Sequence, residues 1–327
     1  MSASGKNPMI RDLGPGQEVT LLAVVSRKNR RAFRDPDKGH YLDLGFSDRS
    51  GAITGRAWEN ADALAERFSV GDVVGVRGFV EEYRGRPQLI VRDIQAVSED
   101  RVDPDRFIPS SPYPLETMEA TLWQTIETVE DPALSELLCG RFGEPEFYQA
   151  YIWAPAAKQV HHNYLNGLLE HSLEVVRLLL SYQKPMLQPL NRDLLIAGGL
   201  LHDVGKIDEY EYRTHIDYTP AGRLLGHIAL GYGRVRDWLF GMAHFPNETA
   251  LHLEHLILSH HGEHSYGAPI LPQTAEAMAL HQADLFSGKV SQVITSSQHA
   301  RERGQKWSEY DRLLQRFLWV PEDGREG

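Results

Sequence analysis

Histidine and aspartate residues are concentrated in one part of this 327-residue chain. Of its 15 histidines, 13 lie between residues 161 and 284, and a single cysteine, Cys139, rules out a cluster of thiolate ligands. The sequence His202-Asp203-Val204-Gly205-Lys206 closes an apolar helical stretch, so that one imidazole and one carboxylate can be offered to the same cation. Gly205 is predicted to stop this helix. A metal site here must therefore use imidazole and carboxylate ligands.

Helical spacing places further candidate metal ligands on the apolar faces of their predicted helices. His171 is flanked at helical intervals by Leu168 and Val175, and Asp284 follows Leu280 by four residues. A buried carboxylate needs a partner because burying it alone is costly. The same spacing directs His260 and His261 inward. Each of these residues has a plainer alternative as a satisfied core or capping side chain.

Three other positions are candidates for the same chemistry. His227 lies between small residues in GRLLGHIALGYG and becomes a ligand if a second metal binds. Lys206 can place a positive charge near a phosphate or a leaving oxygen, with a solvated lysine at a helix end as the alternative. His161 and His162 precede a helix and are either substrate contacts or caps.

The elements that must position these groups fall into two parts. Strands are predicted at 17–27, 40–46, 51–58, 72–80 and 88–97, with a short helix at 59–68 after the third. This is the order of an OB-fold barrel. A proline-rich linker is predicted at 98–114. Helices are then predicted at 115–130, 132–142, 165–182, 192–202, 222–240, 248–261, 274–286 and 308–318. The predicted organisation is a tail (1–16), an all-β OB-fold domain (17–97), the linker, an all-α domain (115–318) and a tail (319–327).

Basic residues of the barrel indicate a nucleic-acid surface. Residues 1–100 carry 15 basic and 15 acidic side chains, so the net charge of −11 belongs to the rest of the chain. The predicted connection between the first two strands holds Arg27, Lys28, Arg30, Arg31 and Arg34, and the last connection holds Arg84 and Arg86. OB-folds use such loops on single strands. Tyr41, Phe46, Trp58 and Tyr83 are candidates for base stacking or for the core. The alternative is a solvated basic loop.

The amino terminus lacks the apolar centre of a signal peptide, and no apolar stretch approaches the ~20 residues that span a bilayer. We therefore expect a cytoplasmic protein without a membrane partner. A homo-oligomer is left open.

The ordered set His171, His202-Asp203 and Asp284 resembles the HD-domain metal-dependent phosphohydrolases. His227 and His260-His261 resemble the HD subfamilies that hold two metals. The strings GLLEHS, LLHDVGKIDEY, GHIALG and LILSHHGE behind an OB-fold resemble the YhaM-type 3′→5′ exoribonucleases over residues 17–318. One departure is Asn166-Gly167, where a pair of glycines is expected.

The resemblance implies two divalent transition metals per chain, manganese first, with cobalt, iron or nickel as alternatives. It implies a first site of His171, His202, Asp203 and Asp284, and a second of His227, His260 and His261 with Asp203 bridging. Catalysis is assigned to Asp203 and Lys206.

The predicted function is a 3′→5′ exonuclease that hydrolyses single-stranded RNA, with DNA as an alternative, to nucleoside monophosphates by metal-activated water. Two other readings stay open. One is an HD phosphohydrolase acting on free or cyclic nucleotides, and the other is a nucleic-acid-binding protein with an inactive HD domain.

Overall fold

The structure is a computed structural model that describes residues 7–33, 35, 39–98, 103–158, 162–181 and 190–321. The chain divides into two compact units. The first comprises residues 1–110 with 212–216, and the second comprises residues 111–211 with 217–327.

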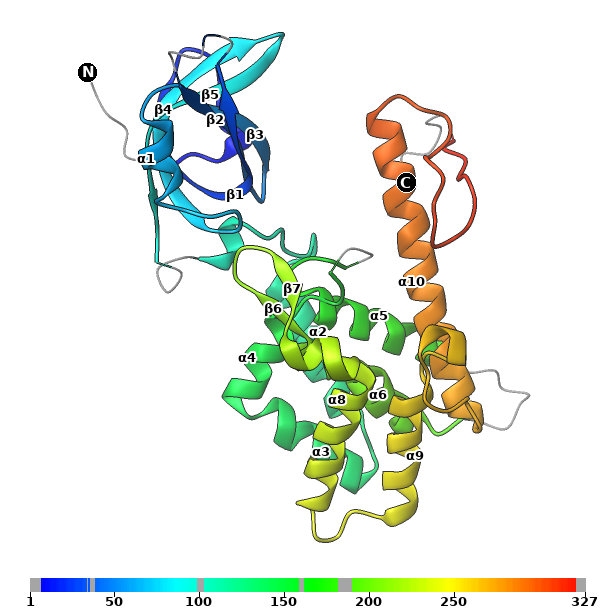
Figure 1. Ribbon diagram of the computed structural model, residues 1–327. Helices are drawn as coiled ribbons and strands as arrows, with labels where there is room; N and C mark the ends of the chain where they lie inside the picture. Colours follow the sequence, from blue (N-terminus) through cyan, green and yellow to red (C-terminus); the bar gives the residue numbers. More distant parts are fainter. Residues whose placement is uncertain are drawn as a thin grey trace. The chain divides into compact units, whose positions relative to one another are not determined.

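The first unit is a closed five-stranded barrel with the strand order β1-β2-β3-β5-β4 (Figure 1). Its elements are β1 (Glu18–Ala32), β2 (His40–Asp48), β3 (Gly51–Ala57), α1 (Ala61–Ala65), β4 (Val73–Tyr83) and β5 (Arg86–Ala96). β3 and β5 pair in parallel, and the other neighbours pair antiparallel. Successive residues of a strand point to opposite faces, so every second side chain fills the interior of the barrel. Leu42, Leu44 and Phe46 are fully buried there. The predicted barrel is confirmed, and Phe46 belongs to its core.

The prediction that the basic residues after the first strand form a loop is wrong for most of them. β1 continues to Ala32, and Arg27 through Ala32 pair residue by residue with Gly45 through His40 of β2. Arg27, Lys28, Arg30 and Arg31 are therefore strand residues, whereas Arg34 lies outside the described residues. The apolar alternation that predicts strands is missing here, because ion pairs take the place of apolar packing. In the last connection only Arg84 and Gly85 form the turn, since Arg86 opens β5.

Arg106 and Phe107 of the predicted linker pack on the barrel, whereas Ser111 bonds to Leu165 and Glu170 of the helical unit. Arg106 donates to the carbonyl oxygens of Pro8 (2.7 Å) and Leu22 (3.3 Å). Phe107 is buried against Val24 and Val73. The domain boundaries themselves stay predictions.

The second unit is built from helices. They are α2 (Leu115–Glu127), α3 (Pro132–Phe142), α4 (Pro145–Trp153), α5 (Gly167–Ser181), α6 (Arg192–Leu201), α7 (Lys206–Glu209), α8 (Pro220–Phe240), α9 (Asn247–Ser259) and α10 (Ala275–Glu302). Periodicity missed the short helices α4 and α7. It also missed a two-stranded sheet of β6 (Tyr210–Tyr212) and β7 (Ile216–Tyr218), because such short elements carry little periodic signal. α10 runs on to Glu302 instead of ending at Phe286.

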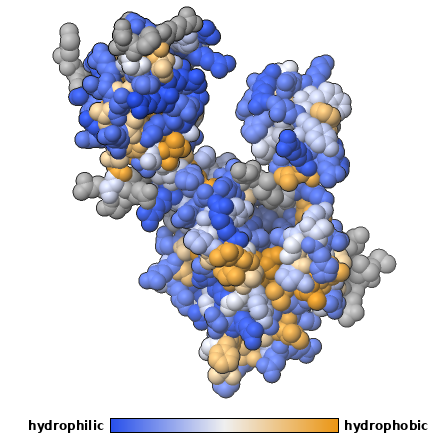
Figure 2. Space-filling model, viewed as in Figure 1, coloured by the Kyte–Doolittle hydropathy of each residue, from blue (hydrophilic) through white to orange (hydrophobic). Residues whose placement is uncertain are grey.

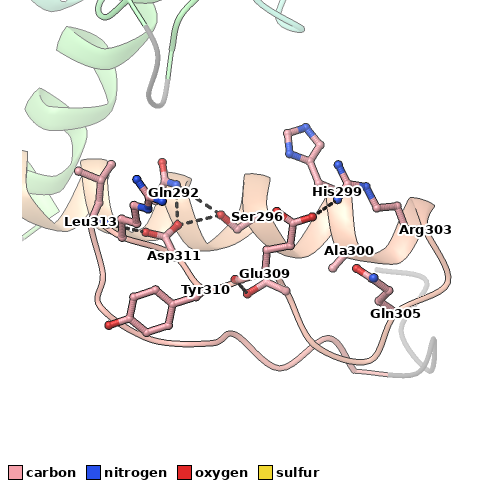
Figure 3. Close-up of a pocket in the computed structure, with 12 residues that line it drawn as sticks. Gln292, Ser296, His299, Ala300, Arg303, Gln305, Glu309, Tyr310, Asp311 and Leu313 are labelled. Carbon is pink, nitrogen blue, oxygen red and sulfur yellow. Dashed lines mark hydrogen bonds and ion pairs between the residues drawn. The ribbon is translucent and has the colours of Figure 1, made fainter.

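The predicted helix at 308–318 is wrong. This segment folds back along α10, with bridges between Trp307 and Trp319 and between Asp311 and Arg316. Figure 3 shows Asp311 accepting hydrogen bonds from Gln292 (2.7 Å) and Ser296 (3.0 Å) of α10. Asp311 also accepts the backbone N–H groups of Leu313 and Leu314, which makes a turn in place of a helix.

Gly205 lies where α8 comes close to the segment that follows α6. Gly205 does not stop α6, which ends at Leu201, and its φ of −67° is right-handed. A Cβ atom on Gly205 would lie 2.0 Å from the carbonyl oxygen of His227 and 2.4 Å from the nitrogen of Gly231. The absent side chain therefore lets α8 approach the segment that follows His202-Asp203. The predicted role of Gly205 as a helix stop is replaced by this packing role.

Replacing Gly205 by Ala should lower the free energy of unfolding of the helical unit by about 1–3 kcal/mol, because the new methyl group meets rigid backbone. The matched control is Gly233→Ala on α8, where a Cβ atom meets nothing within 4 Å. This control should change stability by no more than about 1 kcal/mol, in the stabilising direction. Thermal unfolding of both variants measures the difference. Equal melting temperatures would contradict the packing role of Gly205.

Candidate metal centre

Asp203 lies at the centre of the predicted site. Its side chain is only 3% exposed, and each of its oxygens faces a different pair of histidines. Oδ2 lies 3.5 Å from His171 Nε2 and 3.3 Å from His202 Nε2. Oδ1 lies 3.5 Å from Nε2 of both His227 and His260. One carboxylate therefore joins two groups of imidazoles.

The remaining candidates complete these two groups. In the first, Asp284 Oδ1 lies 3.1 Å from His171 Nε2, and His171, His202 and Asp284 bring their ligand atoms within 4.8 Å of one another. The second group, His227, His260 and His261, meets the same limit. All seven residues predicted as metal ligands are thus brought together, and their roles as ligands stay a proposal.

Every histidine of the two groups has its Nδ1 hydrogen-bonded to an acceptor. Three donate to backbone carbonyl oxygens: His202 to Gly199 (2.9 Å), His260 to Ile257 (2.7 Å) and His261 to Tyr266 (2.7 Å). The two others use side chains: His171 lies 3.2 Å from Ser287 Oγ, and His227 lies 3.1 Å from Glu209 Oε1. With the proton on Nδ1, each ring presents the lone pair of Nε2 to the centre.

In this tautomer the Nε2 lone pairs of neighbouring rings face one another. The Nε2 atoms of His171 and His202 lie 3.2 Å apart, as do those of His227 and His261. His260 Nε2 and Asp203 Oδ1 are buried and have no hydrogen-bond partner among the described residues. Two lone pairs cannot hydrogen-bond each other, so a cation is the partner that satisfies them. The donor set therefore fits a divalent transition metal.

Five helices or helix ends supply these side chains. α5 carries His171 and α10 carries Asp284, whereas His202-Asp203 and His260-His261 follow directly on the last turns of α6 and α9. His227 follows a kink in α8 at Gly226, whose φ of 74° favours glycine. The kink releases the N–H of His227 from the helix, and it donates instead to Glu209 Oε1 (3.0 Å).

Most of these side chains have pKa values shifted toward the forms that bind a metal. His202 is the exception, since burial acts to lower its pKa but the charge of Asp203 raises it above the usual value. Burial lowers the pKa of His171 and of His260, and it lowers the pKa of His261 to about 4. Burial opposes ionisation of Asp203, but the charges of Lys206 and His202 hold its pKa well below the usual range. The pKa of Asp284 is likewise depressed beside His171, despite burial. Neutral imidazoles and ionised carboxylates are the binding forms of these ligands.

Lys206 is part of the centre and not a solvated lysine. Its side chain is 13% exposed, and Nζ lies 2.6 Å from Asp203 Oδ2. Burial acts to lower the pKa of Lys206, but the charge of Asp203 raises it above the usual value. A charged ammonium group therefore holds Asp203. Its predicted part in catalysis stays a proposal.

His162 lies beside the first group, whereas His161 lies outside the described residues. The His162 and His171 rings are 5.6 Å apart between centroids, and His162 Nδ1 lies 2.8 Å from the Tyr164 hydroxyl. Glu170 and Glu174 face its two ring nitrogens at 3.4 and 3.5 Å. His162 is thus held inside a polar network. Its role as a substrate contact stays a prediction.

Supporting residues of the centre were missed from the sequence. Glu174 and Ser287 stand three residues after His171 and Asp284, on the same helices, so the helical spacing already applied could have found them. Ser287 Oγ donates to Glu174 Oε2 (2.7 Å). Glu209 belongs to the string LLHDVGKIDEY and gives no other signal.

The basic residues of the barrel are largely paired. Arg27, Arg31 and Arg56 surround Asp43 at 3.0–3.2 Å, and Arg30 pairs with Asp62 (2.8 Å). Lys28 donates to the carbonyl oxygens of Ala65 (2.9 Å) and Phe68 (2.6 Å), which makes it a structural residue.

Aromatic rings gather beside these arginines. Phe33, Tyr41 and Trp58 form a cluster with centroid separations of 4.9–5.9 Å, and Arg56 lies 5.4 Å from the centre of the Tyr41 ring. At the last turn Arg84 lies over Tyr83, and a pocket there is lined by Tyr83, Arg84, Arg86 and Gln88. The three guanidinium groups around Asp43 carry an excess of two positive charges over that carboxylate, and together with the exposed ring of Trp58 they can bind a single strand.

Comparison with known proteins agrees with both parts. Residues 168–288 match the HD domain family, and residues 19–97 match the OB-fold nucleic acid binding domain family. A crystal structure of a domain of replication protein A from Methanococcus maripaludis covers 28% of this chain and 97% of its own, at 26% identity and a TM-score of 0.25. The predicted OB-fold barrel followed by a helical HD domain is confirmed. Among the described residues, no helix has the length and apolar character to cross a membrane.

Curated relatives span nearly the whole chain. The 3′-5′ exoribonuclease YhaM of Bacillus subtilis is 32% identical over 88% of this chain and 90% of its own length. The protein of the same name in Listeria monocytogenes is 31% identical over 89% of this chain and 90% of its own. Identity at this level over nearly full length establishes common descent, and the chain belongs to the family of the 3′-5′ exoribonucleases YhaM.

Proposed function

We propose that this protein is a metal-dependent 3′→5′ exoribonuclease that releases nucleoside monophosphates from single-stranded RNA. The observation that carries the proposal is Asp203, whose two oxygens each face a group of Nε2 lone pairs. The names of the relatives agree with this activity. Free or cyclic nucleotides as substrates and an inactive HD domain are not favoured, because the ligand set is complete and the relatives are named exoribonucleases.

The chain's own residues would hold the metals and the substrate. His171, His202 and Asp284 would hold the first cation, His227, His260 and His261 the second, and Asp203 would touch both. A divalent cation bound there activates water and offsets the phosphodiester charge. Lys206 keeps Asp203 ionised and in place. Mn²⁺ is the proposed metal, with cobalt, iron or nickel as alternatives, because imidazole-rich sites suit such metals better than magnesium.

The barrel would hold the strand in this scheme. Trp58 is 43% exposed within the aromatic cluster, and Arg30 and Arg31 are more than half exposed beside it. Single-stranded DNA is the second candidate substrate, because stacking and phosphate contacts do not require a 2′-hydroxyl group. A cytoplasmic location suits an RNA substrate. The exposed apolar side chains of Phe286, Val290 and Ile294 on α10 support the proposal of a homo-oligomer.

A 5′-labelled single-stranded RNA incubated with Mn²⁺ should shorten from its 3′ end into a ladder. Asp203→Ala should slow this by more than about 100-fold, since even residues that only support metal ligands cost 10- to 100-fold when removed. Asp237→Ala, an exposed aspartate on α8, is the control and should cleave at the normal rate. Turnover of a free nucleotide without cleavage of any oligonucleotide would contradict the proposal.

Purified wild-type protein loaded with Mn²⁺ should contain about two metals per chain. His227→Ala should retain about one, because it removes a ligand from the second group only. The exposed His244 is the control, and His244→Ala should retain two. Inductively coupled plasma mass spectrometry measures the content. A single metal in the wild type would reduce His227, His260 and His261 to structural or substrate roles.

The double variant Arg30→Ala/Arg31→Ala should bind single-stranded RNA more weakly and with a shallower salt dependence. Loss of two phosphate contacts reduces the slope of log K against log salt by at most about 1.4. Fluorescence anisotropy with a chelator present measures binding without cleavage. The control Arg49→Ala/Arg92→Ala removes two arginines paired elsewhere on the barrel, with Asp105 and Glu18. An equal slope for both double variants would exclude the end of β1 as the contact.

A further inference from the structure

The imidazole of His227 is held between two carboxylates of one short segment. Asp203 Oδ1 lies 3.5 Å from Nε2, and Glu209 Oε1 lies 3.1 Å from the other ring nitrogen, Nδ1. Both carboxylates come from the stretch that ends α6 and forms α7. The ring therefore has one edge toward the centre and the other against Glu209.

Glu209 holds His227 at two points. The same oxygen, Oε1, accepts the ring N–H of Nδ1 and the backbone N–H of His227 at 3.0 Å. The backbone N–H is available because the kink at Gly226 interrupts the hydrogen bonding of α8. Two donors of one residue on one acceptor fix the ring relative to its own backbone. At 15% exposure, His227 is less enclosed than the buried His171, His202 and His260, so it has more need of such support.

The position of Glu209 is itself set by backbone packing. A Cβ atom on Gly222 would lie 2.2 Å from the carbonyl oxygen of Glu209, and Thr219 donates its N–H to that oxygen at 2.9 Å. The start of α8 therefore rests against Glu209. The contacts at Gly222 and at Gly205 hold α8 against α7, one before His227 in the chain and the other at His227 and Gly231.

His260 and His261 are the other two histidines of the second group. Each donates from Nδ1 to a backbone carbonyl oxygen. Of the three, only His227 has a carboxylate as its acceptor. A carboxylate that accepts from Nδ1 makes Nε2 a stronger donor to a metal and fixes the tautomer. The counterpart in the first group is indirect, since His171 reaches Glu174 through Ser287.

We propose that Glu209 is a positioning residue for His227, and that it sets the metal affinity of the second group separately from that of the first. This inference rests on the proposed two-metal function. Glu209 touches neither substrate nor the reacting atoms in this scheme. It acts by holding the Nε2 atom of His227 toward Asp203.

Metal binding tests this without a measurement of activity. Titration calorimetry with Mn²⁺ should show two events in the wild type. Glu209→Ala should weaken one event by about 10- to 100-fold and leave the other unchanged. Glu209→Gln, which keeps the shape and a carbonyl acceptor but removes the charge, should weaken the same event less. The exposed neighbour Glu211 provides the control, and Glu211→Gln should match the wild type.

Glu174→Gln is the reciprocal variant. Glu174 supports His171 of the first group, so this variant should weaken the binding event that Glu209→Ala leaves unchanged. Unchanged titrations of Glu209→Ala, with RNA cleavage and two metals in the wild type, would overturn the role of Glu209 and leave the proposed function standing. Equal weakening of both events, together with a lower melting temperature without metal, would show a structural role and overturn it as well. A single event in the wild type would overturn the two-metal assignment and this role together.

Discussion

The structure of the helical unit depends on the burial of one carboxylate, Asp203. A buried charge is costly unless it is paired, and here the ammonium group of Lys206 pairs with it. Lys206 lies against one oxygen, and four imidazole Nε2 atoms surround the two. The arrangement keeps the site ionised and ready for metal.

Holding that arrangement requires a rigid frame, because the ligands come from distant parts of the chain. Small residues let the helices approach. Gly198 lies against Leu256 of α9 and Gly199 against Val176 of α5, where a Cβ atom would be 2.6 and 2.7 Å from the nearest atoms. Gly205 does the same for α8. Carbonyl, hydroxyl and carboxylate acceptors then orient each ring and with it the direction of its Nε2 lone pair.

The barrel also buries a carboxylate, Asp43, and pairs it with an excess of basic side chains. Asp43 is buried beneath three guanidinium groups, which leaves a positive excess on strand β1 beside the cluster of Phe33, Tyr41 and Trp58. The charge of −11 is confined to the rest of the chain, where bound cations can offset it. An acidic protein can in this way bind a polyanion, since the local field at each contact matters more than the net charge.

The sequence alone determined the barrel order and the main helices, because apolar periodicity is a local property of the chain. Helical spacing pointed to several of the seven residues of the two groups, and the resemblance to the HD-domain phosphohydrolases supplied the full set. Tertiary structure decided what local patterns do not encode. Arg27 to Arg31 became strand residues because β2 supplies their partners, residues 308–318 folded on α10 through Asp311, and Gly205 proved to be a contact point for α8. Glu209 entered the site in the same way, through its contacts with His227 of α8. These roles depend on which side chains meet across helices, and only the packed chain specifies those meetings.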